Sequence, residues 1–344
     1  MKSEIKSISN RINWLDVAKG IGIFLVILSH LPAKDDPNQW LFTYIFSFHM
    51  PLFFFISGIL FSNKYNFIDF VKRKFKTILV PFYVFMFICL IQSVISQYPN
   101  ILIKDIVFTY GTKLFGYGIG MYGYYNGPIW FLGALFYSEI YFYLVTKLNA
   151  KFNNNLIMIL TILIGLLGVI FVKVELPFGI RYFFENSIFL GSGYLLKKPL
   201  FKLSSKLSKI HCILIFIIST AIVLPVSNMN IKVLMCDNAL GNLPIFFICA
   251  ILGIASVFSL SILLKDNKVL QFYGANSIII LCLHLYFNRM LFPFIFNLIG
   301  IDSGFKDTLP GQLTILVLVI ISMYPVIKFC NKYLYFLFGK SKNK

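Results

Sequence analysis

Three ionisable side chains fall within the first apolar run of the sequence: Asp16, Lys19 and His30. Such a residue in a membrane-spanning helix is costly unless it is paired or faces a cavity, so each one marks a candidate site. Eleven residue steps separate Lys19 from His30, and at ~100° per step these place the two within about 20° of one helix face, roughly 16 Å apart along the axis. One face therefore carries a cation near one end and an imidazole near the other. Asp16 lies one turn before Lys19 and can pair with it, and a structural pair that holds the helix in register is the alternative.

Later apolar runs contain further side chains that could line a site: His49, Ser57, Trp130, Glu139 and His284. Pro51 is expected to kink the second run close to His49 and to free a backbone carbonyl. Each residue also has a structural interpretation, because an intramembrane histidine often hydrogen-bonds a neighbouring helix and a glutamate can form an ion pair there. Arg181 and Glu185, which are one turn apart, are expected to form such a pair.

Composition places these residues in a lipid environment. The 344 residues are 58% hydrophobic and 13% charged, a balance that no water-soluble domain of this size tolerates on its surface. The formal charge of +18 lies in short loops and forms no separate basic fold, so no nucleic-acid partner is expected. The six cysteines are scattered without a CxxC pair, and no metal site is expected. The segment from Gly118 to Gly123 fits G-x-G-x-x-G, but no βαβ unit surrounds it, so we interpret it as a loop.

The apolar runs predict an all-α integral membrane protein, with one membrane domain over residues 1–344 and no separate soluble domain. About ten transmembrane helices are expected, at 14–31, 40–62, 78–98, 128–147, 154–173, 180–196, 210–227, 242–264, 276–297 and 311–336. With the N- and C-termini in the cytoplasm, twenty-two Lys and Arg residues lie inside and seven outside, as the positive-inside rule requires. The long external segment from Tyr98 to Gly127 is expected to lie on or re-enter the membrane surface, where it could help to cover an acceptor site.

Five motifs, taken in order, are specific enough to indicate a family. The stronger ones are Leu15–Gly22 followed by His30, Phe46–Gly58 and Ile129–Phe136, and the weaker ones are Leu79–Tyr83 and Asn276–His284. With these motifs the chain resembles, nearly from end to end, the acyltransferase 3 family of membrane acyltransferases, and in particular its fucose-4-O-acetylase-like branch.

The resemblance implies a ten-helix core that takes acetyl-CoA, or a related acyl-CoA, from the cytoplasm and acylates a carbohydrate. In the family, a basic residue and a histidine with ten residues between them mark the catalytic helix, and Lys19 and His30 match this pattern. Basic residues leading into the third helix are associated with the donor, which assigns Arg73 and Lys76 to acyl-CoA binding together with Lys19. A positive-inside marker is their plainer interpretation. Many relatives have Arg where this sequence has Lys, which lacks the bidentate fork for a phosphate.

The expected chemistry is transfer of an acetyl or similar short acyl group to a sugar hydroxyl. His30 is the expected general base or, if it attacks the thioester first, a transient acyl carrier. Asp16 and Lys19 complete the expected catalytic set. The expected acceptor cavity is lined by His49, Ser57, Trp130, Glu139 and His284.

The expected partners are acyl-CoA, the lipid bilayer and a carbohydrate acceptor, such as an exopolysaccharide, an O-antigen-like glycan or a lipid-linked sugar. The expected location is the plasma membrane, as a multi-pass protein. The alternative from another class is a transporter or flippase for a glycan or lipid-linked sugar, since buried charges and kinked helices also mark transport paths. A non-catalytic assembly subunit is a second alternative, in which His30 would be dispensable.

Overall fold

The computed structural model describes residues 12–31, 39–97, 104, 111–112, 115, 127–152, 155–301 and 303–340. Within these residues the regular structure is helical, apart from one isolated antiparallel bridge between Leu234 and Ala239. The expected all-α class is therefore confirmed. Most of the segment from Tyr98 to Gly127, and both ends of the chain, lie outside the described residues, so the orientation of the termini stays a prediction.

The first half of the chain forms α2 (Asn13–Ser29), α3 (Gln39–Phe46), α4 (His49–Leu60), α5 (Phe67–Lys74), the π-helix η1 (Phe75–Leu79), α6 (Val80–Gln97), the 3₁₀ turn η3 (Gly127–Ile129), α9 (Trp130–Phe152) and α10 (Leu156–Phe171). The second half forms η4 (Pro177–Gly179), α11 (Ile180–Ser204), α12 (Lys209–Ser227), η5 (Met235–Asp237), α13 (Leu243–Leu263), α14 (Lys268–Ala275), α15 (Ser277–Tyr286), the π-helix η6 (Phe287–Leu291), α16 (Phe292–Leu298), η7 (Ser303–Asp307), α17 (Leu309–Tyr333) and η8 (Tyr335–Phe338).

Each of the ten expected helices has a helical counterpart. In the described residues, seven helical stretches are long and apolar enough to cross a membrane: Gln39–Leu60, Phe67–Ile95, Gly127–Phe152, Lys209–Ser227, Leu243–Leu263, Ser277–Leu298 and Leu309–Tyr333. α10 is apolar but has only 16 residues, and α2 has 17. The count of ten crossings therefore stays a prediction.

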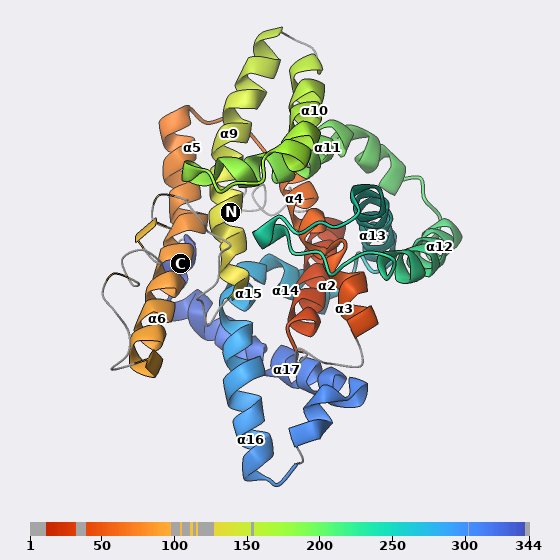
Figure 1. The fold of residues 1–344 in the computed structure, drawn as a ribbon. Coiled ribbons are helices and arrows are strands. Elements are labelled where there is room, and N and C mark those ends of the chain that lie inside the picture. Colours follow the sequence, from red (N-terminus) through yellow and green to blue (C-terminus); the bar gives the residue numbers. More distant parts are fainter. Residues whose placement is uncertain are drawn as a thin grey trace, which may run out of the picture.

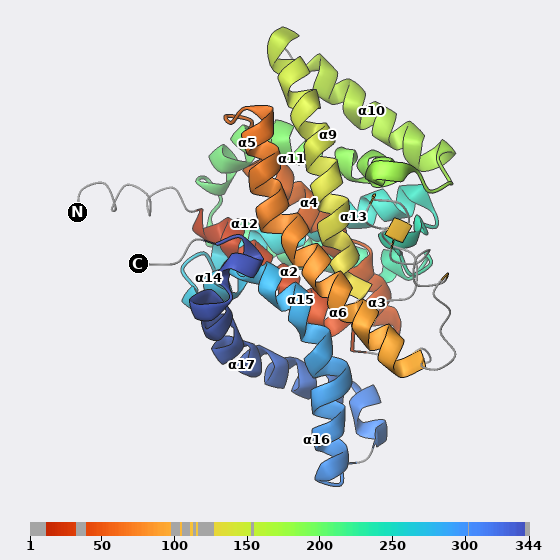
Figure 2. The ribbon, with the colours of Figure 1, turned by 90° about the vertical axis from the view of Figure 1, so that its left-hand side faces the viewer.

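The second expected helix, 40–62, is broken into α3 and α4 at Ser47 and Phe48, slightly before the kink expected at Pro51. Proline has no amide hydrogen, so Pro51 cannot donate to the carbonyl of Ser47, and the helical ladder is interrupted there. The Ser47 hydroxyl turns back and donates to the Tyr44 carbonyl oxygen at 2.7 Å. The third expected helix begins earlier than residue 78, because α5, η1 and α6 form one continuous rod beside α9 (Figure 2).

α2 lies at the centre of the bundle, where it contacts α3, α4, α13, α14, α15 and α17 (Figure 1). α14 was not expected as a separate helix, although Asn267 caps its first turn by accepting from the Leu270 amide. α2 and α14 cross at backbone contact through two glycines. A Cβ atom on Gly20 would meet the carbonyl of Leu270, and one on Gly274 would meet the carbonyl of Asp16. Small residues permit such close helix packing in membranes.

A second crossing of this kind joins α4 to α11. A Cβ atom on Gly58 would meet the Leu190 carbonyl, and one on Gly193 would meet the Phe55 carbonyl. Two glycine crossings thus fix the two helices that carry the first two motifs against the rest of the bundle.

Candidate functional site

Three histidines near one end of α2 are oriented in the same way. His30 follows the last residue of α2, and its Nδ1 lies 2.8 Å from the carbonyl oxygen of Val26. In His49 and His284, Nδ1 lies 2.9 Å and 3.0 Å from the carbonyl oxygen four residues earlier. Because a carbonyl oxygen only accepts, Nδ1 is the donor in each neutral ring and Nε2 keeps its lone pair. Each Nε2 is therefore the atom that can act as a base or a nucleophile.

Two of these imidazoles meet edge to face. The ring centroids of His30 and His284 are 5.5 Å apart, with an interplanar angle of 78°. His284 is buried and His30 half-buried. Among the described residues, the Nε2 atom of His284 has no hydrogen-bond partner. Buried polar atoms are usually paired, so an unpaired nitrogen beside His30 indicates a site that serves chemistry or binding.

An aromatic ring and a cation complete this end. The Phe46 ring centroid lies 5.9 Å from that of His30 and 4.9 Å from that of His49, and the Lys232 Nζ lies 4.3 Å from the centre of the Phe46 ring. We call these residues, with His284, the histidine cluster. Lys232 comes from the loop between α12 and α13, and burial lowers its pKa. Sequence reasoning placed Lys232 only in an external loop, because no local pattern links it to Phe46.

Asn288, one turn after His284, connects α2 to the π-helix η6. Its amide nitrogen lies 3.4 Å from the carbonyl oxygen of Ile27, and the residue is buried. π-helical turns often occur at functional sites. A spacing of four residues places Asn288 and His284 on one helix face, but spacing alone does not identify the partner of Asn288 on α2.

A line of three cavities follows one face of α2 toward the histidine cluster. The outer cavity has a volume of about 480 Å³ and includes Asp16, the middle one has about 220 Å³ and includes Lys19, and the inner one has about 30 Å³ and includes Ile23 and Val26. With His30, these residues are spaced by three or four along the helix and share one face. The stripe read from the sequence thus runs along a passage that narrows from the lysine end toward the imidazole end.

Adjacent cavities share walls, so little separates them. The outer and middle cavities share Ala275, Asn276 and Lys340, and the middle and inner cavities share Phe53, Phe131, Ser277 and Ile278. The inner cavity is also lined by Leu281, which lies three residues before His284. The passage therefore lies between α2 and the start of α15.

The wide end of the passage carries two lysines held by polar partners. Lys19 Nζ lies 2.6 Å from a carboxylate oxygen of Asp16, and its side chain is 22% exposed. Lys340 Nζ donates to the side-chain oxygens of Asn276 at 2.6 Å and Asn331 at 2.7 Å. The expected pair of Asp16 and Lys19 is present. Lys340 was missed, because it stands far along the chain in an unremarkable basic tail.

Two of the three basic residues expected to bind the donor, Arg73 and Lys76, lie away from the cavities along α2. The Arg73 guanidinium sits 4.4 Å above the centre of the Tyr65 ring, and the Lys76 carbonyl lies against Gly339. Neither residue lines the three cavities. Their role in donor binding stays a prediction.

The residues expected in one acceptor cavity are distributed over four places. Ser57 lines the middle cavity, the Trp130 ring lies 5.9 Å from the ring of Tyr182, and Glu139 forms an ion pair with Lys74 at 2.6 Å. Of the five, the two histidines belong to the histidine cluster. The ion pair of Glu139 agrees with the alternative that this glutamate has a structural role.

Arg181 forms the centre of a separate buried network. Its guanidinium lies 2.7 Å from Glu175 and 3.0 Å from Glu185, and it donates to the Cys236 carbonyl oxygen at 2.6 Å. The expected pairing of Arg181 with Glu185 is therefore confirmed. This network fastens α11 to the loop between α12 and α13.

Fold and site together indicate a multi-pass membrane protein, all-helical in its described residues, with a row of three cavities along α2 that begins at the lysines and ends one turn before the imidazoles. The family model described as an acyltransferase domain matches residues 12–328. The chain belongs to this acyltransferase family. No curated protein and no solved structure matches it.

Proposed function

We propose that this acyltransferase transfers an acetyl, or similar short acyl, group from acetyl-CoA to a hydroxyl of a carbohydrate, with His30 at the point of transfer. The observation that carries the proposal is the row of cavities along α2, which begins at Asp16 and Lys19 and ends at Val26, one turn before His30. An acyl-CoA has the matching form, because a bulky anionic nucleotide is joined by a long thin arm to the thioester.

The wide end suits the anionic part of the donor. Lys19 and Lys340 supply two cations beside the outer and middle cavities, and charge-assisted hydrogen bonds to phosphate are among the stronger ones in proteins. Exposed Lys268 lines the outer cavity and adds a third cation. Lysines bind a phosphate as point charges, without the bidentate geometry of arginine.

The narrow end suits the acyl arm. Its walls are mostly apolar and include Ile23, Met50 and Leu281. A thin apolar channel admits the arm while keeping bulk water away, which protects the thioester from hydrolysis. The resting volume of about 30 Å³ means that side chains must rotate before the arm can pass.

In direct transfer, His30 Nε2 takes the proton of the sugar hydroxyl as its oxygen attacks the thioester carbonyl carbon. The tetrahedral intermediate then collapses, the carbon–sulfur bond breaks, and the CoA thiolate takes the proton from the imidazolium. In the two-step route, His30 Nε2 attacks the thioester first and carries the acetyl group, and CoA leaves. The sugar hydroxyl then needs a second base, and the unpaired Nε2 of His284 stands beside His30 for that role.

A carbohydrate acceptor is supported by the resemblance to fucose-4-O-acetylase-like proteins and by the polar groups at the imidazole end. Asn288 is buried there, and the exposed Arg289 is next to it in the chain. A few well-placed polar groups typically orient a ligand rich in hydroxyls.

The test is a reaction of the purified protein with acetyl-CoA and a panel of free, polymeric and lipid-linked sugars. Free CoA thiol is measured over time, and the acetylated sugar is identified by mass spectrometry. We expect CoA release that depends on one class of acceptor. A burst of one CoA per protein without acceptor would select the acyl-imidazole route. Intact thioester with every acceptor, together with movement of a glycan across vesicles, would overturn the proposal in favour of a transporter.

A further inference from the structure

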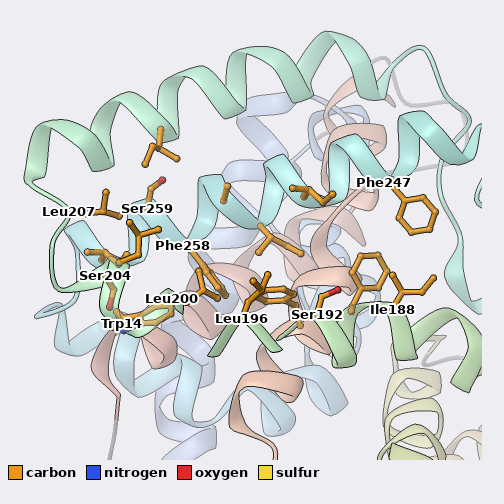
Figure 3. A pocket seen from close by; sticks show the side chains of 18 residues that line it. Trp14, Ile188, Ser192, Leu196, Leu200, Ser204, Leu207, Phe247, Phe258 and Ser259 are labelled. Carbon is orange, nitrogen blue, oxygen red and sulfur yellow. The ribbon is translucent and has the colours of Figure 1, made fainter. Parts of the chain in front are cut away.

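A separate cavity of about 360 Å³ lies between α11, α12 and α13 (Figure 3). Its volume is typical of small-molecule sites, which are roughly 300–1,000 Å³. One wall is a stripe along α11 from Ile188 to Ser204, continued by Leu207 in the turn that follows, and the facing wall is a stripe along α13 from Phe247 to Ile262. Trp14, at the start of α2, closes one end. None of its lining residues lines the three cavities along α2.

The walls of this cavity offer almost nothing to a polar ligand. All but three of the lining residues are apolar, and the three are serines. Two of these hydroxyls donate within their own helix, Ser204 to the Phe201 carbonyl at 2.9 Å and Ser259 to the Ser256 carbonyl at 2.8 Å. A polar ligand would lose its hydrogen bonds to water without replacement. The chemistry of the walls therefore fits a hydrocarbon chain.

The mouth of the cavity is apolar as well. Leu196 is 46% exposed, Leu203 is 49% exposed and Ile251 is 64% exposed, although all three line the cavity. α12 and α13, two of the surrounding helices, are membrane-crossing candidates. In a bilayer, such a mouth faces acyl chains, which can enter from the side.

A basic patch borders the end of the cavity that is lined by Trp14, Ser204 and Leu207. It consists of the exposed residues Lys206 and Lys209, in the turn after α11 and at the start of α12. Residues 187–236 contain no Asp or Glu. The turn after α13 adds Lys265 and one acid, Asp266. Clustered lysines beside an apolar slot complement an anionic headgroup.

We propose that this cavity binds an acyl chain of an anionic phospholipid, whose phosphate lies on the basic patch. The bound chain contacts Trp14, whose ring packs edge to face on Phe258 of α13 at 5.1 Å and on Phe201 of α11 at 6.1 Å. The lipid therefore braces the start of α2, two residues before Asp16. The site needs no acyl-CoA, so the proposal stands independently of the proposed function.

Trp14 supplies a direct reporter of this site. The protein has three tryptophans, and the variant Trp40→Phe/Trp130→Phe leaves only Trp14. This full-length variant is reconstituted in phosphatidylcholine vesicles that contain increasing fractions of phosphatidylglycerol with brominated acyl chains. Bromine quenches tryptophan on contact. We expect saturable quenching of Trp14 at low fractions of brominated phosphatidylglycerol, and weak quenching by brominated phosphatidylcholine at equal fractions.

Two matched pairs of variants, built on the single-tryptophan protein, separate chain from headgroup. Ala255→Phe fills the cavity, and Ala221→Phe places the same ring on the exposed face of α12. Lys206→Gln/Lys209→Gln removes two charges of the basic patch, and Lys198→Gln/Lys202→Gln removes an exposed pair from the face of α11 that is turned away from the cavity. We expect Ala255→Phe to abolish the saturable quenching and the patch variant to raise the phosphatidylglycerol fraction at half-quenching about tenfold or more. Both controls should leave it unchanged.

Equal quenching by the two lipids, or quenching that survives Ala255→Phe, would overturn the proposal. Size-exclusion elution and thermal unfolding of each variant show whether it is folded. If Ala255→Phe does not fold, the patch variant and its control decide alone, because exposed lysines can be changed without touching the core. An unchanged half-quenching fraction in the patch variant would then overturn the anionic site.

Discussion

The polar side chains near the two ends of α2 differ in whether their hydrogen-bonding atoms are paired. At the wide end, Lys19 and Lys340 are held by a carboxylate and two amide oxygens within hydrogen-bonding distance. At the other end, every Nδ1 is paired with the carbonyl oxygen four residues earlier in the chain, and the buried Nε2 of His284 has no partner among the described residues. Satisfied charges suit binding, because they are already in place for an anion. Atoms left with a free lone pair suit proton or acyl transfer.

The sharpest test of this contrast is His30→Ala. Because the base or acyl carrier is lost, we expect the rate of acetyl transfer to fall about 10²- to 10⁴-fold, the usual contribution of a positioned base. Donor affinity, measured by calorimetry with acetyl-CoA, should stay nearly unchanged. His211→Ala is the matched control, since this histidine is exposed at the start of α12. Equal loss of folding and activity in His30→Ala would instead make this histidine structural.

Lys19→Gln should have the opposite effect, with weaker donor binding and a nearly unchanged rate of transfer. Removing a charged hydrogen bond to a CoA phosphate should weaken donor binding by about 1.5–3 kcal/mol, or roughly ten- to a hundredfold in Kd. Lys340→Gln should behave alike, because Lys340 lines the middle cavity together with Lys19 and also lines the outer cavity. The rate at saturating donor should change little in both variants. A full rate loss with normal donor affinity would place the phosphates elsewhere.

Arg73→Gln tests whether Arg73 binds the donor, as the family resemblance implies, or only packs on Tyr65, as its position indicates. The family pattern assigns Arg73 to the donor, whereas its guanidinium lies over Tyr65 and outside the passage. If the donor nucleotide extends to η1, Kd for acetyl-CoA should rise by about tenfold. If Arg73 only packs on the tyrosine, Arg73→Gln should match wild type in calorimetry and differ only by a small drop in Tm.

The smallest expected effect concerns Lys232 at the imidazole end. Burial lowers the pKa of Lys232 in the folded protein, so the unfolded chain binds this proton more tightly. Between the lowered folded pKa and the ordinary value near 10.4, folding stability should therefore rise with pH. Lys232→Gln should flatten that alkaline rise in Tm by a degree or so. Parallel Tm curves for the two proteins from neutral to alkaline pH would show that the amine is not buried in solution.

The sequence predicts those parts of the fold and site that depend on local periodicity. The ten apolar segments, the shared face of Lys19 and His30, and the pair of Asp16 with Lys19 all follow from spacing along one helix. The expected kink close to His49 is present as the break at Ser47 and Phe48, since the chain leaves the helix in the turn that loses the amide donor of Pro51.

The features that could not be predicted from the sequence depend on contacts between distant segments of the chain. Lys232 reaches Phe46, and Lys340 reaches Asn276, across long stretches of chain. Glu139 and Trp130 looked like cavity residues because they are polar or aromatic in apolar helices. In the structure they contact Lys74 and Tyr182, and no spacing in the sequence names those partners.

The glycine crossing of α2 and α14 bears on how fast the inner cavity can open. With Gly20 and Gly274 each against a carbonyl of the other helix, α2 and α14 are in direct backbone contact, and a sliding or rotation of α2 would have to break this packing. Opening of the narrow end is therefore left to rotation of the shared aromatic walls, Phe53 and Phe131. Side-chain rotation is generally faster than the microsecond-to-millisecond motion of whole helices. Donor entry should then keep pace with catalysis, and turnover should not wait for a change of global conformation.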